Sequence, residues 1–413
     1  MLTALETGVR GGRWHALNDK VRRPLNLYAA AQSVEANNGA AGVDHVSVTQ
    51  FAARQQEELD RLEQQLRDGT YRPQQIRRTW IPKPGSNEQR PLGIPTVRDR
   101  RPMRSMCARQ TALLHVVEPI FDHTFHEHSY GFRRGRGCQH ALRRVEKLLA
   151  DGYTFVVDAD LKSYFDTIPH DRLMDRVREK VSDGRLLRLV EAFLKQGVLE
   201  GLAAWTPEQG TPQGAVISPL LANVYLNPLD HLLAEAGFEM VRYADDFVIL
   251  CRTREDAERA LATVQAWVAD NGLTRHPDKT KIVDSREDGF DFLGYHFRGS
   301  KRFPRKKSLA KIRDAVRPIT KRQNGNSLAC IIARLNVKLR GWFAYFRHCH
   351  PTAFPNLDGW IRRRLRTILR KRHRRKGMAY GLDHQRWPNT FFHEQGLYCL
   401  KTAYESFRQS CFR

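Results

Sequence analysis

The chain has 413 residues, which exceeds one ordinary domain and suffices to bury a large core. It carries a net charge of +24 and seven scattered cysteines, none in a CxxC pair, and it has no run of ~18 apolar residues. These features argue against a zinc ribbon, a secreted protein and a membrane protein. They favour a reduced, cytoplasmic compartment and no membrane partner, and they leave the oligomeric state open.

The excess positive charge is concentrated in one window. Residues 301–376 hold 24 Lys and Arg against two acids, Asp314 and Asp358, whereas the rest of the chain is nearly balanced. A charge run is usually a solvated face, but this one is too long and too one-sided for that interpretation. We therefore expect an extended polyanion as the partner.

In chain order, residues 1–75 read as a mainly helical extension that leads into a hairpin. Two β-like runs, 78–81 and 90–94, flank a Pro-Gly-Ser-Asn turn. Lys83 and Arg90 would face each other across this hairpin, where two cations can clamp a triphosphate. The alternative is a pair of ordinary exposed cations on a loop.

Residues 126–137, HEHSYGFRRGRG, are rich in glycine and arginine. This composition suits a close approach of the backbone to phosphates, although the spacing is not that of a nucleotide P-loop. His123, His126 and His128 could bind a metal, but surface histidines are the better interpretation.

A buried strand is expected at 155–159, with Asp158 and Asp160 on the same face. The pattern turns helical after Asp160, so the carbonyl of Leu161 is exposed beside the Asp160 carboxylate. Asp160 and Leu161 are therefore candidate metal ligands. Asp160 could also be the N-cap of the following helix.

Residues 210–219, GTPQGAVISP, open a long apolar helix. Gly214 lets a backbone come close to a bound base or sugar, and Gln213 can hydrogen-bond a ligand there. A plain loop before a core helix is the alternative interpretation.

Residues 242–250, RYADDFVIL, predict a tight hairpin with Asp245 and Asp246 at its tip. Adjacent carboxylates repel each other, and a cation that prefers oxygen ligands, such as Mg²⁺, relieves this repulsion. A solvated Asp-Asp turn is the alternative. With Asp160 as a third acid, the set suits nucleotidyl transfer on two ions about 3.5–4 Å apart.

Two helices are expected in the basic window. Apolar residues recur at intervals of 3 or 4 from Leu328 to Phe346, and residues 360–376, WIRRRLRTILRKRHRRK, repeat the pattern with a denser basic face. Packed together, such helices form a cationic groove. The candidate RNA contacts are Arg334, Lys338, Arg362, Arg363, Arg366, Arg370, Lys371 and Arg372.

The chain resembles the group II intron reverse transcriptase/maturase family over nearly its whole length. Eight ordered motifs carry the resemblance: GAAGVD at 39–44, RPLGIPTVRDR at 90–100, HSYGFRRGRG at 128–137, VVDADLKSYFDTIPH at 156–170, GTPQGAVISPL at 210–220, RYADDFVIL at 242–250, DFLGYHF at 291–297 and LRGWFAYF at 339–346.

This resemblance implies an α+β right-hand polymerase, with fingers and a palm built on antiparallel sheet, followed by an α-helical thumb. The expected regions are the extension and start of the fingers at 1–75, the fingers and palm at 76–297, the basic helical thumb or maturase domain at 298–380, and a short tail at 381–413. Residues 101–107, RPMRSMC, look like an insertion of about seven residues in the fingers.

The resemblance also implies RNA-directed DNA polymerisation and a maturase role in group II intron splicing and mobility. The implied partners are intron RNA or an RNA template, a DNA primer or target DNA, and dNTPs. The implied site residues are Asp160, Asp245 and Asp246 for two Mg²⁺ ions, with Mn²⁺ as a substitute; Lys83, Arg90, Phe165, Gln213 and Lys279 for the incoming nucleotide; and Phe292, Leu293 and Gly294 for the primer grip.

Many relatives continue into an HNH endonuclease with paired cysteines, which this sequence does not show, so second-strand cleavage is not expected. We expect a bacterial-type cytoplasmic protein that associates with the nucleoid when it acts on DNA. One alternative is a domesticated relative serving CRISPR acquisition, phage defence or DNA repair. Another is a non-catalytic RNA-binding splicing factor, against which the three aspartates argue.

Overall fold

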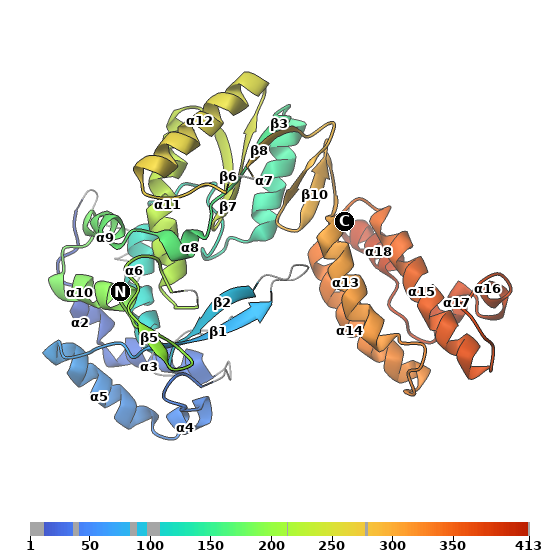
Figure 1. Ribbon diagram of the computed structural model, residues 1–413, viewed down its shortest axis with the longest axis horizontal. Helices are drawn as coiled ribbons and strands as arrows, with labels where there is room; N and C mark the ends of the chain where they lie inside the picture. The colour runs from blue at the N-terminus through green and yellow to red at the C-terminus, as the bar shows by residue number, and fades with distance from the viewer. Residues whose placement is uncertain are drawn as a thin grey trace. The chain divides into compact units, whose positions relative to one another are not determined.

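The computed structural model describes residues 12–35, 41–82, 89–96, 108–212, 214–276 and 280–411. The insertion expected at 101–107 lies outside this range. The chain divides into two compact units, Met1–Val283 and Asp284–Arg413 (Figure 1). Within the described residues, every helix is too short or too polar to cross a bilayer.

The first unit combines helices with two four-stranded sheets. Its described helices are α2 (Asn18–Val21), α3 (Pro24–Glu35), α4 (Val48–Ala52), α5 (Gln55–Asp68), α6 (Ala108–Asp122), α7 (Cys138–Ala150), α8 (Tyr164–Thr167), α9 (His170–Arg178), α10 (Gly184–Leu194), α11 (Ser218–Glu235) and α12 (Arg254–Asp270). Its described strands are β1 (Ile76–Pro82), β2 (Gln89–Ile94), β3 (Phe155–Asp160), β4 (Val198–Glu200), β5 (Ala203–Trp205), β6 (Glu239–Tyr243), β7 (Asp246–Cys251) and β8 (Lys281–Asp284).

The first sheet has the order β2-β1-β4-β5 and contains the hairpin predicted upstream. β1 and β2 pair antiparallel from Arg77↔Ile94 to Pro82↔Gln89, which confirms that hairpin. β4 pairs parallel to β1 and antiparallel to β5, so the hairpin is extended into a broader sheet.

The second sheet has the order β6-β7-β3-β8 and is covered on both faces. Val157 and Ile249 belong to the main core together with residues of α12, while α7 packs against β6 and β7 (Figure 1). Because both faces are buried, β7 is apolar along its length except at Asp246. Asp246 therefore stands out at the start of an otherwise buried strand.

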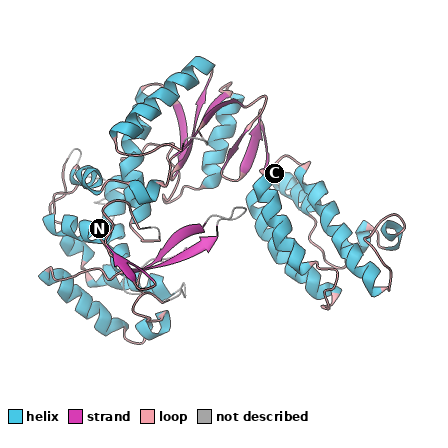
Figure 2. Cartoon of the chain, viewed as in Figure 1, coloured by secondary structure: helices cyan, strands magenta, loops and turns pink. Residues whose placement is uncertain are grey.

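The second unit is a small antiparallel sheet followed by helices (Figure 2). Its strands are β9 (Phe290–Phe292), β10 (Tyr295–Arg298) and β11 (Lys301–Pro304), in the order β11-β10-β9. Its described helices are α13 (Lys306–Ile319), α14 (Leu328–Phe346), α15 (Ala353–Arg372), α16 (Asp383–Arg386), α17 (Asn389–Glu394) and α18 (Leu400–Cys411). The predicted α+β architecture with a helical C-terminal region is therefore confirmed.

The two helices predicted in the basic window are both present. α14 has the predicted bounds and buries Ile332, Leu335 and Leu339 on one stripe. The second helix, α15, begins at Ala353 and ends at Arg372, so residues 373–376 lie beyond its C-terminus. Residues 381–411, expected as a tail, contribute α16, α17 and α18.

Asp358 on α15 anchors the N-terminus of α18. It is 4% exposed, and its carboxylate accepts hydrogen bonds from the backbone N–H of Leu400 at 3.0 Å and of Lys401 at 3.0 Å. The thiol of Cys399 also donates to it, at 3.3 Å. These bonds satisfy N–H groups that have no partner inside the helix.

We predict that Asp358→Ala lowers the free energy of unfolding by about 1–3 kcal/mol, because it leaves helix N–H groups buried without acceptors. Urea denaturation of the full chain measures this change. Asp314→Ala is the control, since Asp314 is an exposed acid paired with Arg317 and should contribute less than about 0.5 kcal/mol. Equal losses in the two variants would contradict the anchoring role.

Candidate catalytic site and RNA-binding surface

The second sheet brings the three predicted aspartates together. Asp160 is the last residue of β3 and pairs with Asp246, the first residue of β7. Residues paired in this way have Cα atoms about 4.5–5.5 Å apart and side chains on the same face. Asp245 precedes Asp246 in the turn, so the three carboxylates gather at one edge of the sheet. Asp160 and Asp245 are partly exposed, and Asp246 is exposed.

The turn between β6 and β7 is a two-residue hairpin loop. Tyr243 pairs with Asp246, so Ala244 and Asp245 form the loop. Ala244 has φ of 61°, a left-handed conformation that hairpin loops of this length use but that residues other than glycine adopt at some cost in energy. Burial, and then a hydrogen bond with Cys138, raise the pKa of Tyr243 to about 12, so its hydroxyl stays protonated.

The chain beyond Asp160 favours a ligand role for Leu161. The Asp160 carbonyl accepts from His276 N at 2.8 Å, and Lys162 N donates to Thr274 O at 2.8 Å. Because successive carbonyls of an extended chain point in opposite directions, the Leu161 carbonyl points away from residues 274–276. The N-cap of α8 is Ser163, so the alternative role of Asp160 as N-cap is wrong.

These oxygen ligands fit a divalent cation such as Mg²⁺, which prefers carboxylates and carbonyls. Among the described side chains, no group of three or more His, Cys, Asp or Glu already has the spacing of a formed metal site. Asp160, Asp245 and Asp246 thus fit a divalent ion by the chemistry of their oxygen ligands, while their side chains are not arranged around one in this structure.

Phe165 borders a cavity of about 800 Å³ that Gly93, Thr211 and Pro212 also line. Its neighbour Tyr164 points the other way, is fully buried, and donates from its hydroxyl to Ala222 O at 2.7 Å. Phe165 is only partly buried and contacts Tyr164 edge to face. Phe165 therefore has one side against the core and another toward the cavity.

The turn after Pro212 touches the first sheet. Gly214 has φ of 101°, and a Cβ there would lie 2.3 Å from the Gly93 carbonyl oxygen, so only glycine fits this approach. Lys83, Gln213 and Lys279 lie outside the described residues. Arg90 pairs with Ile81 in β2, and its side chain is likewise not described.

The predicted primer grip is the tight turn between β9 and β10. Phe292 is buried, and Leu293 and Gly294 have φ of 46° and 82°. The hydroxyl of Tyr345 donates to Leu293 O at 2.7 Å, and that of Ser308 donates to Gly294 O at 2.9 Å. Helices α13 and α14 thus each donate a side-chain hydrogen bond to the backbone of this turn.

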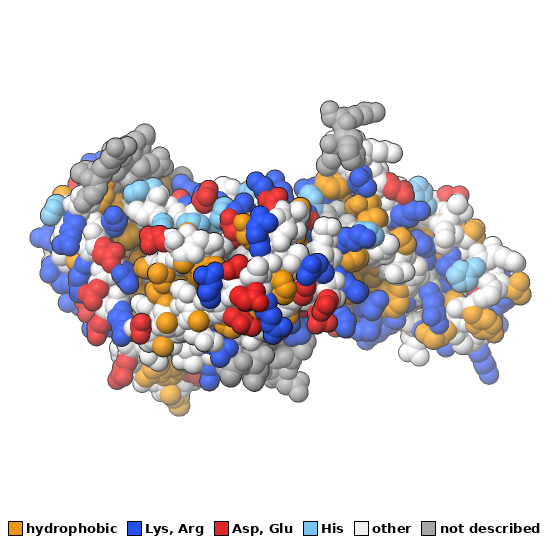
Figure 3. All heavy atoms as spheres, turned by 90° about the horizontal axis from the view of Figure 1, so that it is seen from above, with side chains coloured by type: hydrophobic (Ala, Val, Ile, Leu, Met, Phe, Trp, Pro, Cys, Tyr) orange, Lys and Arg blue, Asp and Glu red, His pale blue; other side chains and the backbone are white. Residues whose placement is uncertain are grey.

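The candidate RNA contacts divide into exposed and buried residues. Exposed side chains, which suit contact with a polyanion, are Arg334, Lys338, Arg363, Lys371 and Arg372, and Arg362 is partly exposed. On the visible face of the second unit, Asp284–Arg413, Figure 3 shows more Lys and Arg side chains than Asp and Glu side chains.

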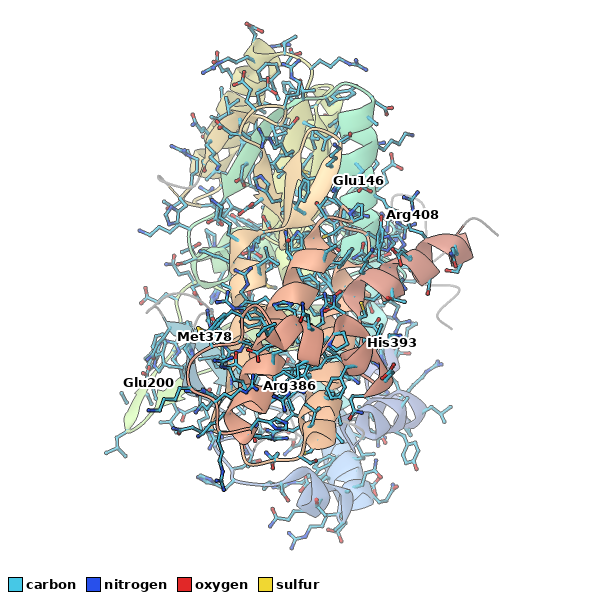
Figure 4. All side chains as sticks on the ribbon, turned by 90° about the vertical axis from the view of Figure 1, so that its right-hand side faces the viewer. Glu146, Glu200, Met378, Arg386, His393 and Arg408 are labelled. Carbon is cyan, nitrogen blue, oxygen red and sulfur yellow. The ribbon has the colours of Figure 1, made fainter. Side chains whose placement is uncertain are left out.

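Arg366 and Arg370 have structural partners instead. Arg366 is 2% exposed and donates to Trp387 O at 2.8 Å and to Asn389 at 2.9 Å. Arg370 pairs with the buried Asp383 at 2.7 Å. Both attach the segment after α15 to that helix; Figure 4 marks this part of the unit by Met378, Arg386 and His393. Arg366 is therefore a correction to the expected RNA-binding set, because its guanidinium faces the protein interior.

In residues 126–137, Arg133 is buried and is not available to phosphates, whereas Arg134 is exposed. Arg133 is 8% exposed and donates to Asp122, to His126 O and to Ser129 O. Burial lowers the pKa of His128 to about 4, with Arg144 adding to the shift, so its imidazole is neutral at pH 7. This segment instead packs beside β6, at the root of the Asp245 turn.

Sequence reasoning missed Arg242, a residue of the predicted hairpin that is wholly buried against Asp230. The available signal was an arginine that follows the apolar pair Met240 and Val241 in β6, because a buried arginine requires a partner.

Two family models match the chain. The model for reverse transcriptase (RNA-dependent DNA polymerase) matches residues 81–297, and the model for the group II intron, maturase-specific domain matches residues 309–387.

Relatives agree with these matches. Protein YkfC of Escherichia coli (strain K12) is 35% identical over 316 residues, covering 67% of this chain and 81% of YkfC. Group II intron-encoded protein LtrA of Lactococcus lactis subsp. cremoris is 36% identical over 222 residues, covering 53% of this chain and 35% of LtrA. The match thus spans about a third of LtrA. A chain of the solved partial Cas6-RT-Cas1–Cas2 complex is 22% identical, covering 62% of this chain and 42% of that chain, with a TM-score of 0.36, too low to bear on function.

Proposed function

Because the chain belongs to the group II intron-encoded reverse transcriptase/maturase family, we propose that it is an active RNA-directed DNA polymerase that also binds its intron RNA. The observation that carries the polymerase activity is the register of β3 and β7, which sets Asp160 opposite Asp246 and beside Asp245. Nucleotidyl transfer on two ions requires carboxylates that converge from separate strands in this way.

Asp160, Asp245 and Asp246, together with the Leu161 carbonyl, would hold two Mg²⁺ ions, for which Mn²⁺ can substitute. When bound, these ions activate the primer 3′-oxygen and stabilise the leaving pyrophosphate. The chain's own part is to orient the reactants: Lys83 and Arg90 would clamp the triphosphate, and Lys279 would protonate pyrophosphate.

The substrates we propose are dNTPs, a DNA primer and an RNA template. Phe165 and Gln213 would line the nucleotide, and Leu293 and Gly294 would contact the primer. The exposed cations of α14 and α15 would bind RNA phosphates. A domesticated role in CRISPR acquisition, phage defence or repair would keep this chemistry and change the RNA. Whether the DNA that flanks the gene encodes an intron RNA structure distinguishes the two roles.

We predict that Asp245→Ala reduces primer extension on an RNA template by at least about 10²-fold, because single groups that stabilise transition-state charge contribute about 3–4 kcal/mol. The measurement is kcat for dNTP addition, with a melting curve and an RNA-binding titration alongside. Asp175→Ala, which removes an exposed acid paired with Arg178, is the control and should extend normally. Extension by Asp245→Ala near the wild-type rate would favour a non-catalytic splicing factor.

We predict that Phe165→Ala raises ribonucleotide use relative to deoxyribonucleotide use, because the ring would otherwise exclude a 2′-hydroxyl by steric clash. The measurement is the ratio of kcat/KM for a ribonucleotide and its deoxy counterpart on one RNA template. Tyr164→Phe is the control: it loses a buried hydrogen bond and some stability, yet should keep the ratio. If Phe165 is only core, its truncation costs about 3–5 kcal/mol of stability and leaves the ratio unchanged.

We predict that replacing Lys338, Arg363 and Lys371 together by Gln flattens the salt dependence of RNA binding. Each lost phosphate contact lowers the slope of log affinity against log salt by roughly 0.7–0.9. Filter binding to RNA transcribed from the DNA flanking the gene measures this slope. The control removes equal charge from the first unit at Arg178, Lys195 and Arg259, which are all paired with acids. An equal slope change in the control would show that only net charge matters.

A further inference from the structure

The turn that carries Asp245 has an unfavourable backbone and must be held by its surroundings. Ala244 is 8% exposed and has a left-handed φ of 61°. A residue with a Cβ in this conformation persists only where neighbouring contacts fix it. Arg242 of β6 and Gly131 of the segment 128–131 lie against Ala244. Asn223 of α11 is hydrogen-bonded to both of these residues.

The guanidinium of Arg242 is the centre of these contacts. It is fully buried, with Nε donating to Asp230 Oδ1 at 2.8 Å and Nη2 paired with Asp230 Oδ2. Nη1 donates to Asn223 Oδ1 at 2.8 Å and to Ala244 O at 2.9 Å. A buried ion pair contributes little net stability, but its fixed fork of donors sets geometry. Arg242 thus ties the turn to two residues of α11.

The segment 128–131 closes the other side of the turn. Arg242 N donates to His128 O at 3.0 Å, and Tyr130 N donates to Arg242 O at 2.9 Å, so the segment runs beside β6. Asn223 Nδ2 donates to Gly131 O at 2.8 Å. A Cβ on Gly131 would lie 2.2 Å from Ala244 N and 2.9 Å from Tyr243 C. Gly131 is therefore the residue whose lack of a side chain lets the segment touch the turn.

We propose that Gly131, Asn223 and Arg242, here called the turn cradle, are positioning residues that hold the backbone of the turn carrying Asp245 and Asp246 in one conformation, so that only the side chains remain to be ordered when an ion binds. This inference rests on the proposed polymerase function. Two adjacent carboxylates repel each other, so a loose turn would let them separate. Each ion would then have to draw them back together. If the cradle keeps the turn rigid, metal binding does not have to supply the free energy for this ordering. Catalytic groups must be held within about 0.5 Å of their productive positions.

The cradle also gives residues 126–137 a role that differs from contact with phosphates. Gly131 lies against the backbone of Tyr243 and Ala244. Arg133 donates hydrogen bonds to the carbonyl oxygens of His126 and Ser129 in the same segment, which hold its conformation. Gly131 and Arg133 thus support the hairpin, whereas Arg134 is exposed and an added Cβ at Gly135 or Gly137 would meet open space.

The test compares Gly131→Ala with Gly137→Ala in the same segment. Gly137 has φ of −163° and no atom within 4 Å of an added Cβ, so its substitution is a matched control. We expect Gly131→Ala to lower kcat for dNTP addition at least tenfold, with the affinity for primer–template unchanged. Direct Mn²⁺ binding, measured by electron paramagnetic resonance, should weaken at least fivefold. Hydrogen exchange in a peptide spanning residues 240–250 should accelerate. Gly137→Ala should match the wild type in all three.

Asn223→Ala is the second variant, since it removes both hydrogen bonds of the Asn223 side chain, to Arg242 and to Gly131, without adding volume. We expect it to weaken Mn²⁺ binding and speed exchange in the same peptide. If Gly131→Ala does not melt cooperatively, Asn223→Ala decides alone. Wild-type Mn²⁺ affinity and exchange in folded Gly131→Ala or in Asn223→Ala would overturn the cradle. An inactive wild-type protein would instead overturn the proposed function, and the comparison of Mn²⁺ affinities would still test the cradle.

Discussion

The register between β3 and β7 is the constraint on which the rest of the site depends. The same pairing that sets Asp160 opposite Asp246 also sets Val157 opposite Ile249 in the core that α12 covers. Because side chains alternate across a strand, a slip of one residue would turn the carboxylates to the opposite face and exchange the side chains of β7 that pack against α7 and α12. The apolar packing of the sheet and the placement of the acids are therefore fixed by one set of contacts.

Local patterns were enough to predict the parts of the fold that local chemistry decides. The paired acids between two apolar runs indicated the hairpin, and the interval of 3 or 4 between apolar residues indicated α14 with its correct bounds. Asp160 could be placed because a strand that ends in an acid and continues as a helix leaves few alternatives. Each of these features depends on neighbours within about ten residues.

Features that depend on a distant partner were not predictable in this way. Arg366 looked like part of a basic face, but residues 387–389 fold back onto α15 and bury it. To predict the role of Gly131, one must know that it lies against Ala244, more than a hundred residues away. To predict the role of Arg242, one must know that it pairs with Asp230 on another element. The periodicity of apolar residues predicts which face of a helix packs against the core. It does not predict that another segment of the chain will cover the opposite, polar face. The part that Gly131 plays in supporting the turn was missed for the same reason.

The attachment of the turn at Leu293 and Gly294 has a consequence for how this chain can be recombined. Tyr345 and Ser308 bind its carbonyl oxygens, and the turn lies in the unit that begins at Asp284. The hairpin of β9 and β10 therefore belongs structurally with the helices that follow it, although the match to the reverse transcriptase family model extends to residue 297. A chimera that exchanges C-terminal halves between relatives keeps these bonds when it is joined near Val283, and it separates the hairpin from its supports when it is joined after 297.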